Sequence, residues 1–236
     1  MFFLKKKTVE KIGFLRNFTD CHCHILPGVD DGVRSMDDAL NILKIYEDYG
    51  VNSVRLTPHI MEEMPNETSA LQKRFEELKK AYAEVPVRPN VQKVQLNLSA
   101  EYMMDPLFEE RLQNKDLLTY VGDDKLLVET SYFNPPSDMI GILQRIKSKG
   151  FYPVLAHPER YLYMSTKDYE KLRRMDVEFQ LNLGSLSNCY GKKVKKNAEF
   201  ILNKRWYNYV GTDLHSTSML ERILNADATN LNKSNN

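Results

Sequence analysis

The chain has 236 residues, 42% of them hydrophobic, which is enough for one barrel-sized domain with a packed core. Its 33 lysines and arginines are balanced by 32 aspartates and glutamates, so a strong net field that attracts nucleic acid is excluded. The 3 cysteines form no disulfide framework, and we expect a cytoplasmic protein in a reducing compartment.

The two ends differ in composition from the rest of the chain. Residues 1–17 join a short apolar start to a basic patch but lack the apolar length of a signal peptide or membrane span, which predicts an N-terminal tail without stable membrane insertion. Alternatively, Phe2 and Phe3 touch a membrane surface or a membrane-bound partner. Residues 221–236 are polar and are predicted as a C-terminal tail. Residues 18–220 are predicted as one domain.

Between these ends, short runs of β-branched and apolar residues alternate with longer segments of helical periodicity, as in βα units around a parallel sheet. Seven strands are predicted, at about residues 18–24, 51–59, 94–102, 125–132, 152–160, 178–185 and 207–215. Helices are predicted at about 35–49, 66–84, 166–174 and 191–204, with one more ending at Gly150. No linker or repeat interrupts this alternation, so we predict a single closed or nearly closed TIM-like α/β barrel.

The first strand lies in the stretch FTDCHCHILPGVDDG, residues 18–32. Because side chains alternate along a strand, Asp20, His22 and His24 are predicted to share one face, with Cys21 and Cys23 packed on the other. We expect Asp20 either to orient an imidazole from outside the ligand set or to be a buried, hydrogen-bonded carboxylate.

Every histidine of the chain lies at the C-terminal end of a predicted strand, where barrels place their active sites. These are His22, His24, His59, His157 and His215. Carboxylates occupy equivalent places, namely Asp30, Asp31, Glu101, Glu129 and Asp213. One such histidine alone would indicate a structural imidazole, but the whole set predicts a centre for divalent ions such as Zn, Mn or Fe. The candidates outnumber the roughly four to six ligands of one ion, which predicts two or three metals.

The motifs DCHCHILPGVDDG, TPH, SAEY, HPERY and GTDLH together resemble the polymerase and histidinol phosphatase (PHP) superfamily. The resemblance covers about residues 18–215 and is strongest to the metal-dependent protein-tyrosine phosphatases of bacterial capsule and exopolysaccharide operons. It implies a distorted (β/α)7 barrel with three metal ions at the C-terminal ends of the strands, manganese being the first candidate. The ligands it implies are His22, His24, Asp31, His59, Glu101, Glu129, His157, Asp213 and His215, with Glu101 as the bridge and Asp30 as the substitute for Asp31.

The chemistry implied is phosphoester hydrolysis by a metal-bound hydroxide, without a phosphoenzyme. Arg160 in HPER is the predicted phosphate-binding catalytic residue, the alternative being a surface ion pair with Glu159. Arg34 is a second catalytic candidate, with a solvated residue at a helix start as the alternative. A cysteine phosphatase needs an arginine six positions after its thiolate, but Pro27, Val29 and Lys195 stand there, which excludes that mechanism.

The resemblance further implies a partner, the phosphotyrosine-bearing tail of a membrane-bound bacterial tyrosine kinase of capsule synthesis. Two other functions stay open. One is a small-molecule phosphatase of the histidinol phosphatase type, and the other is a module that binds phosphotyrosine without hydrolysing it. The balanced charge predicts no nucleic-acid partner, and the sequence leaves the oligomeric state open.

Overall fold

The structure is a computed structural model that describes residues 7–226 except 121, 123 and 188. The strands are β1 (Thr19–Cys23), β2 (Ser53–Leu56), β3 (His59–Ile60), β4 (Gln95–Leu98), β5 (Glu101–Met103), β6 (Lys125–Glu129), β7 (Tyr152–Ala156), β8 (Glu178–Asn182) and β9 (Tyr207–Gly211). The α-helices are α1 (Met36–Tyr49), α2 (Thr68–Glu84), α3 (Pro106–Asn114), α4 (Met139–Ser148), α5 (Thr166–Arg174), α6 (Lys192–Asn203) and α7 (Thr217–Leu224). Two short 3-10 helices follow β7 and β8 (Pro158–Arg160 and Leu183–Leu186).

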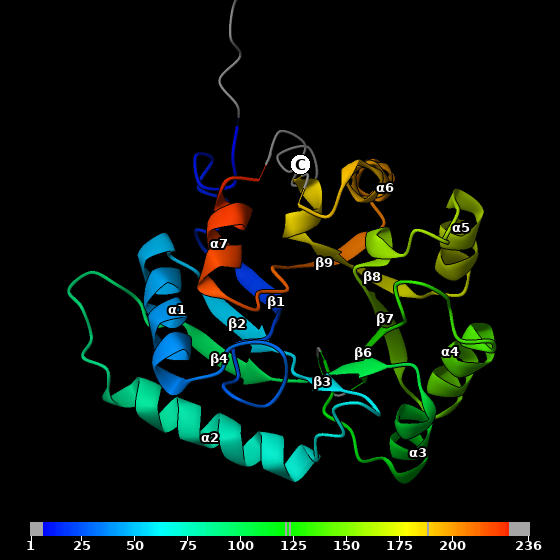
Figure 1. Ribbon diagram of the computed structural model, residues 1–236, viewed down its shortest axis with the longest axis horizontal. Helices are drawn as coiled ribbons and strands as arrows, with labels where there is room; N and C mark the ends of the chain where they lie inside the picture. The colour runs from blue at the N-terminus through cyan, green and yellow to red at the C-terminus, as the bar shows by residue number, and fades with distance from the viewer. Residues whose placement is uncertain (1–6, 121, 123, 188, 227–236) are drawn as a thin grey trace, which may run out of the picture.

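The strands form two parallel sheets, ordered β1-β2-β4 and β3-β5-β6-β7-β8-β9. In Figure 1 they surround a common interior, with α1 and α2 outside β2 and β4, and α3, α4 and α5 outside β6, β7 and β8. The first and last strands, which belong to different sheets, meet where Cys23 at the end of β1 forms a parallel bridge with Leu214, just after β9. The predicted α/β architecture with parallel strands is therefore confirmed.

The strand count differs from the prediction because two predicted strands are each interrupted. The segment 51–59 is divided into β2 and β3, and 94–102 into β4 and β5. Pro58 lies in the first gap, where its missing N–H cannot join a strand ladder. The helix α3 was not predicted, although Asp105 and Pro106 are a helix-start signature. The Asp105 side chain caps this helix by accepting the N–H of Phe108 at 2.8 Å.

The predicted alternation of side chains along β1 is wrong in its first half. The pairing of β1 with β2 shifts between Asp20 and Cys23, as in a β-bulge with one extra residue. Cys21 consequently packs on a small interior cluster, next to His22 in the metal-ligand region. Asp20 instead accepts a 2.6 Å hydrogen bond from the hydroxyl of Tyr46 in α1. The expectation of a buried, hydrogen-bonded Asp20 is confirmed, whereas Asp20 contacts no imidazole ring.

Both predicted tails include residues that pack on the folded chain, so the boundaries at 17 and 220 need correction. Val9 is fully buried, and its N–H donates to the carbonyl of Ala226 at 3.1 Å. The helix α7 starts before residue 221 and buries Ile223. The proposed membrane contact of Phe2 and Phe3 lies outside the described residues. In the described part of the chain, no helix has the length and apolar character needed to cross a membrane.

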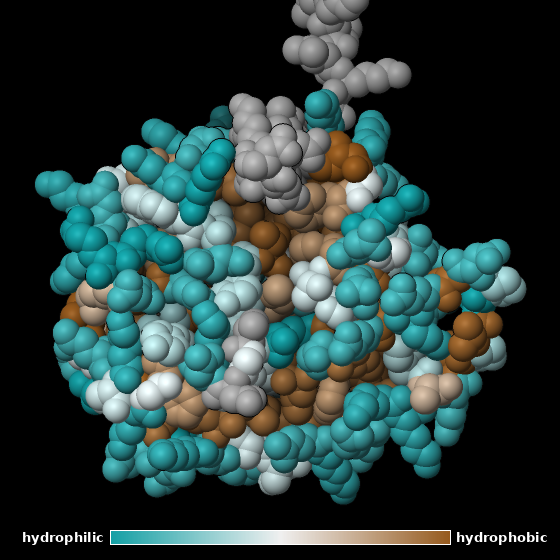
Figure 2. Space-filling view, turned by 180° about the vertical axis from the view of Figure 1, so that it is seen from behind, coloured by the Kyte–Doolittle hydropathy of each residue, from teal (hydrophilic) through white to brown (hydrophobic). Residues whose placement is uncertain are grey.

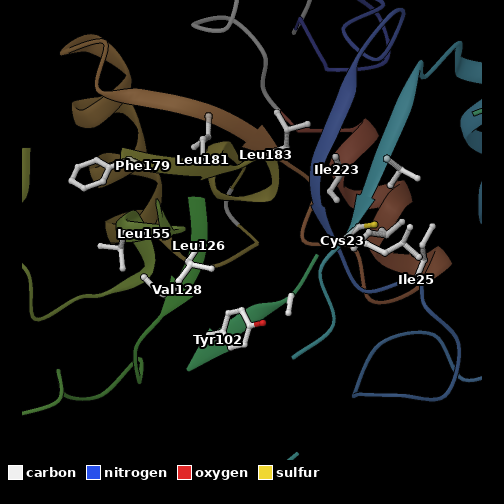
Figure 3. Packing of buried hydrophobic residues seen from close by; sticks show 14 of the residues in the cluster. Cys23, Ile25, Tyr102, Leu126, Val128, Leu155, Phe179, Leu181, Leu183 and Ile223 are labelled. Carbon is white, nitrogen blue, oxygen red and sulfur yellow. The ribbon is translucent and has the colours of Figure 1, made fainter. Parts of the chain in front are cut away.

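Most of the apolar core lies between the strands and the surrounding helices. Figure 3 shows Leu126 and Val128 of β6, Leu155 of β7, and Phe179 and Leu181 of β8 in this layer, all fully buried. The face seen in Figure 2 is mostly hydrophilic, with hydrophobic residues visible between the polar ones near its middle. The core thus fixes the strands from outside and leaves the strand ends free to present polar side chains.

Candidate metal centre

The predicted ligands from six strand ends come together in one cluster, which is buried except for the exposed Asp31 and the half-buried His215. Three overlapping groups form, and within each group the ligand atoms lie within 4.8 Å of one another. The groups are His24, Asp31, His59 and His215; His22, His24, Glu101 and Asp213; and His59, Glu101 and Glu129. His157 is outside these groups, but its Nε2 is 3.0 Å from Oε1 of Glu101. Glu101 therefore lies between His157 and the other histidines.

Three of the histidines are oriented by an acceptor at Nδ1. This nitrogen lies 2.9 Å from Oε1 of Gln180 in His22, 2.8 Å from Oδ2 of Asp30 in His24, and 2.9 Å from the carbonyl of Asp213 in His215. Because these oxygens only accept, Nδ1 carries a proton in each ring, and Nε2 holds the lone pair when the imidazole is neutral. The three Nε2 atoms are thereby prepared as metal ligands.

One close contact in the cluster joins two buried polar atoms that form no hydrogen bond of good geometry. Nδ1 of His59 and Oε1 of Glu129 are both buried and 3.1 Å apart, yet neither atom has a hydrogen-bond partner among the described residues. Buried polar atoms in such a position are costly unless something satisfies them. A divalent ion between these atoms and Glu101 would do so, and mixed imidazole and carboxylate donors suit Zn, Mn or Fe.

In the metal-free cluster, neighbouring histidines and carboxylates shift one another's pKa values. Burial opposes the charged form of His22, but the carboxylates of Glu101 and Asp213 raise the pKa of His22 to about 9. Burial favours the neutral form of Glu101 as well, but the surrounding histidines hold the pKa of its carboxyl well below the usual range. A hydrogen bond from His215, against a smaller burial effect, lowers the pKa of Asp31 to about 2. The raised pKa of His22 means that a metal ion bound there must displace a proton.

The backbone around the cluster has two unusual features, namely glycines that lie very close to the ligand residues and left-handed conformations in residues other than glycine. A Cβ on Gly211 would lie 2.5 Å from Cβ of His22, and one on Gly32 would lie 2.0 Å from the carbonyl oxygen of His24. His157 and Asp213 have left-handed backbones, with φ of 31° and 52°. Such conformations in residues other than glycine gather at functional sites, because the surrounding structure must enforce them.

Arg160 lies at the edge of the cluster, between two aromatic rings. Its Nη1 donates to Oδ2 of Asp213 at 2.6 Å, and its guanidinium carbon is 4.4 Å from the ring centre of Tyr132 and 4.5 Å from that of Tyr190. The alternative pairing with Glu159 is not found, because that carboxylate is buried and accepts from the backbone of Asn182. Arg160 is thus a fixed, rigidly held cation beside the candidate ligands.

The other candidates take different places. Asp30 is outside the metal groups; it accepts from His24 and, at 3.1 Å, from the N–H of His59, and so supports two candidate ligands. Arg34 is exposed and lines a cavity of about 350 Å³ that it shares with His215. It therefore lies near the centre, and it lines this cavity without Arg160.

Sequence reasoning missed the neutral residues that support the ligands. Oε1 of Gln180 accepts from His22 and, at 3.3 Å, from the N–H of His157. Nδ2 of Asn182 donates to Asp213 at 2.9 Å. The two residues are two positions apart on β8, so their side chains face the same interior. This shared face was readable from the sequence once β8 was assigned.

Comparisons with known proteins agree with this picture. A family model described as capsular polysaccharide synthesis, CpsB/CapC, matches residues 18–234. The chain is 25% identical over 200 residues to the tyrosine-protein phosphatase YwqE of Bacillus subtilis, covering 84% of this chain and 77% of that protein. It is 25% identical over 222 residues to the putative tyrosine-protein phosphatase CapC of Staphylococcus aureus, covering 87% and 82%. It is 29% identical over 209 residues to the tyrosine-protein phosphatase CpsB of Streptococcus pneumoniae, covering 84% and 82%.

Among solved structures, the chain is similar to one from work on YwqE of Bacillus subtilis and CpsB of Streptococcus pneumoniae, described as metal-dependent tyrosine phosphatases. The TM-score is 0.77 at 23% sequence identity, covering 90% of this chain and 84% of the other. This likeness supports the fold.

Proposed function

The chain belongs to the CpsB/CapC family of capsular polysaccharide synthesis, and we propose that it is a metal-dependent protein-tyrosine phosphatase. Its relatives in three genera are named tyrosine-protein phosphatases. The single observation that carries the proposal is the overlap of the three ligand groups, one of which includes Asp213, the partner of the fixed guanidinium of Arg160. This juxtaposition combines a site for cations with a group that recognises phosphate oxygens.

The overlap of the groups favours three ions. His24 belongs to two groups, as do His59 and Glu101, so these residues would lie between neighbouring ions. The proposed ligands are His22, His24, Asp31, His59, Glu101, Glu129, His157, Asp213 and His215. Manganese is the first candidate, with zinc or iron as alternatives. We also interpret the two interrupted strands as parts of single barrel strands, which makes the fold a distorted (β/α)7 barrel.

When bound, the ions would supply the nucleophile at neutral pH and neutralise the phosphoryl oxygens. Arg160 would bind two of those oxygens through its planar fork, and it would be in place beforehand because Asp213, Tyr132 and Tyr190 fix it. A phenolate leaving group, with a conjugate-acid pKa of about 10, needs less help from a general acid than an alkoxide. The residues present therefore suit a tyrosyl phosphate.

The physiological substrate that we propose is the phosphotyrosine-bearing tail of a membrane-bound tyrosine kinase of capsule or exopolysaccharide synthesis. The family of the chain and the names of its relatives support this assignment. It places the enzyme in the cytoplasm, where such a tail would be reached.

The test is phosphate release from a phosphotyrosine peptide and from histidinol phosphate, by protein stripped with a chelator and reloaded with Mn, Zn, Fe or Mg. We expect metal-dependent turnover of the peptide, reduced about 10²- to 10³-fold in Arg160→Ala because a preorganised phosphate contact is lost. Arg174→Ala, which removes an exposed arginine of α5, is the matched control and should retain full activity. Turnover of neither substrate by protein with bound metal would contradict the proposal and favour a binding module.

A further inference from the structure

A groove of about 520 Å³ lies beside the metal centre, between the loops that follow β3, β5 and β6. Met61 lines it from the first loop, Met104 from the second, and Tyr132 and Phe133 from the third. The same three strands carry His59, Glu101 and Glu129, the third group of candidate ligands. The groove therefore opens at the rim of the barrel next to the proposed reaction site.

The groove joins the metal centre through one shared side chain. Tyr132 lines the groove, while its ring also lies over the guanidinium of Arg160 and 5.8 Å from the ring of His157. An extended peptide advances about 3.3 Å per residue, so the residues next to a bound phosphotyrosine would lie within reach of this groove. Position alone thus connects the groove to a peptide substrate.

The walls of the groove are apolar and adaptable. Met61 and Met104 are 8% and 4% exposed, so they form its floor, and methionine side chains adjust to partners of different shape. Phe133 at the rim is 83% exposed, the largest value among the exposed large hydrophobic residues that the structure describes. Large exposed apolar side chains beside a cavity are typical of binding sites.

The rim of the groove is acidic. Glu62, Glu63 and Asp105 line it, and its lining contains no lysine, arginine or histidine. None of the three carboxylates forms an ion pair with a basic residue in the described part of the chain, although Asp105 accepts two backbone N–H groups. An unbalanced set of carboxylates favours a cationic ligand and disfavours an acidic one.

We propose that this groove binds the residues next to the phosphotyrosine of a peptide substrate, and that it selects an apolar side chain accompanied by a lysine or arginine. The inference rests on the proposed phosphatase function, because it takes the phosphotyrosine to lie at the metal centre. It extends that function from the phosphoryl group to the sequence around it.

The experiment compares three peptides that carry a non-hydrolysable phosphonate analogue of phosphotyrosine. Fluorescence anisotropy measures the affinity of each peptide for the whole, metal-loaded chain. Their flanking positions hold leucine with lysine, leucine with glutamate, or serine with glutamate. We expect affinity to fall about tenfold at each step, because first the charge complementarity and then the buried leucine is lost. Turnover of para-nitrophenyl phosphate by the same preparation reports separately on the proposed activity.

Paired variants assign the preference to the groove. Glu62→Gln/Glu63→Gln should remove the preference for lysine over glutamate, and Phe133→Ala should weaken binding of both leucine peptides. The matched controls are Glu84→Gln/Glu110→Gln, which remove two exposed carboxylates outside the groove, and Val87→Ala, which truncates a side chain that is 73% exposed elsewhere. These controls should bind like the parent protein.

Equal affinity for the three peptides, or a preference that survives the groove variants, would overturn the inference. If para-nitrophenyl phosphate is still hydrolysed in that case, the proposed function stands and only the groove assignment fails. If the peptides are discriminated but no phosphoester is hydrolysed, the groove stands as a recognition site and the hydrolytic function fails.

Discussion

Gln180 shows how much a metal ligand depends on a residue that does not bind the metal. Its Oε1 accepts from Nδ1 of His22 at 2.9 Å, and its Nε2 donates to the carbonyl of Leu181 at 2.5 Å. The second bond fixes which end of the amide faces the imidazole. Gln180 therefore determines that Nε2 of His22 faces the centre with a free lone pair.

Replacing Gln180 should weaken the metal centre while leaving the ligands in place. We expect Gln180→Ala to lower the affinity for the first metal ions by about 10- to 100-fold, since the tautomer and orientation of His22 are released. Gln180→Glu keeps an acceptor for Nδ1 and should recover most of the loss. Competition with a chelating indicator measures both.

Asn97→Ala is the control for that comparison, because Asn97 is a partly buried amide of β4 whose side chain donates only to the carbonyl of Val54. Its metal affinity should equal that of the parent protein. An unchanged affinity in Gln180→Ala would show that His22 is oriented without this bond.

At this scale, the sequence predicted the residues that bear charge better than those that support them. The histidines could be recognised because all five of them follow predicted strands, a placement with a known functional meaning. Gln180 and Asn182 were missed, because the spacing along β8 shows that they share a face but does not show which ligand each of them supports. The partners of Arg160 were equally hidden, since Tyr132 and Tyr190 are 58 residues apart in the chain.

Among the elements, β1 has the most demanding role, because it carries His22, is followed directly by the Cys23–His24 step of the site, and also connects to β9. Asp20 makes this connection: its carboxylate accepts from the N–H and the hydroxyl of Thr212, at 2.8 and 2.6 Å, and from the hydroxyl of Tyr46. Burial raises the pKa of Asp20, although these hydrogen bonds oppose the shift. The strand is thus held to α1 and to the end of β9 by one side chain.

Asp20→Ala should lower the free energy of unfolding by about 2–4 kcal/mol, because several buried donors lose their acceptor at once. Tyr46→Phe removes a single hydrogen bond and should cost about 1 kcal/mol. Urea denaturation followed by circular dichroism gives both values. Similar stability for Asp20→Ala and the parent protein would show that water replaces the carboxylate.

The elements predicted from periodicity were found where the pattern was long, and the errors have local causes. The helix predicted at 35–49 corresponds to α1, which begins after Ser35 as N-cap and ends at Gly50 with φ of 71°. The interruption at Pro58 was readable from the sequence, because proline cannot complete a strand ladder. The β-bulge was not, since an extra residue in a strand is visible only against its partner.

For the whole molecule, metal ions at the proposed centre would connect strands from both sheets, so their removal should affect global stability. Ligands of the second group come from β1, β5 and the segment after β9. A ligand present at about 100 times its dissociation constant adds about 2.7 kcal/mol to the stability of the folded state. Stripping the protein should therefore lower Tm by about 5–10 °C.

The size of this loss should depend on pH. In the stripped protein the raised pKa of His22, about 9, contributes stability below the usual histidine pKa, and this contribution is lost as pH rises toward 9. Metal binding must also displace that proton, so it strengthens over the same range. Calorimetry should therefore find a larger difference in Tm between loaded and stripped protein at pH 8 than at pH 6. An equal difference at both values would contradict the role of these protons.

The predicted α/β architecture with parallel strands was correct for the molecule as a whole, because βα alternation strongly limits topology. The association of strands into two sheets was not predictable, since it depends on where two neighbouring strands are interrupted together. The packing of Val9 and Ile223 was hidden in segments whose average composition is polar or basic.

The extra residue in β1 has a consequence for how sequences in this family can diverge. Between Asp20 and His24 the number of residues matters as much as their identity, because loss of one residue would turn a histidine toward α1 and return Cys21 to the outer face. A point substitution at Cys21 leaves the number of residues in β1 unchanged. A deletion beside Cys21 would turn the histidines of this strand away from the candidate metal centre. An alignment gap at this position in an otherwise similar chain would mark a protein that keeps the fold and lacks the proposed metal centre.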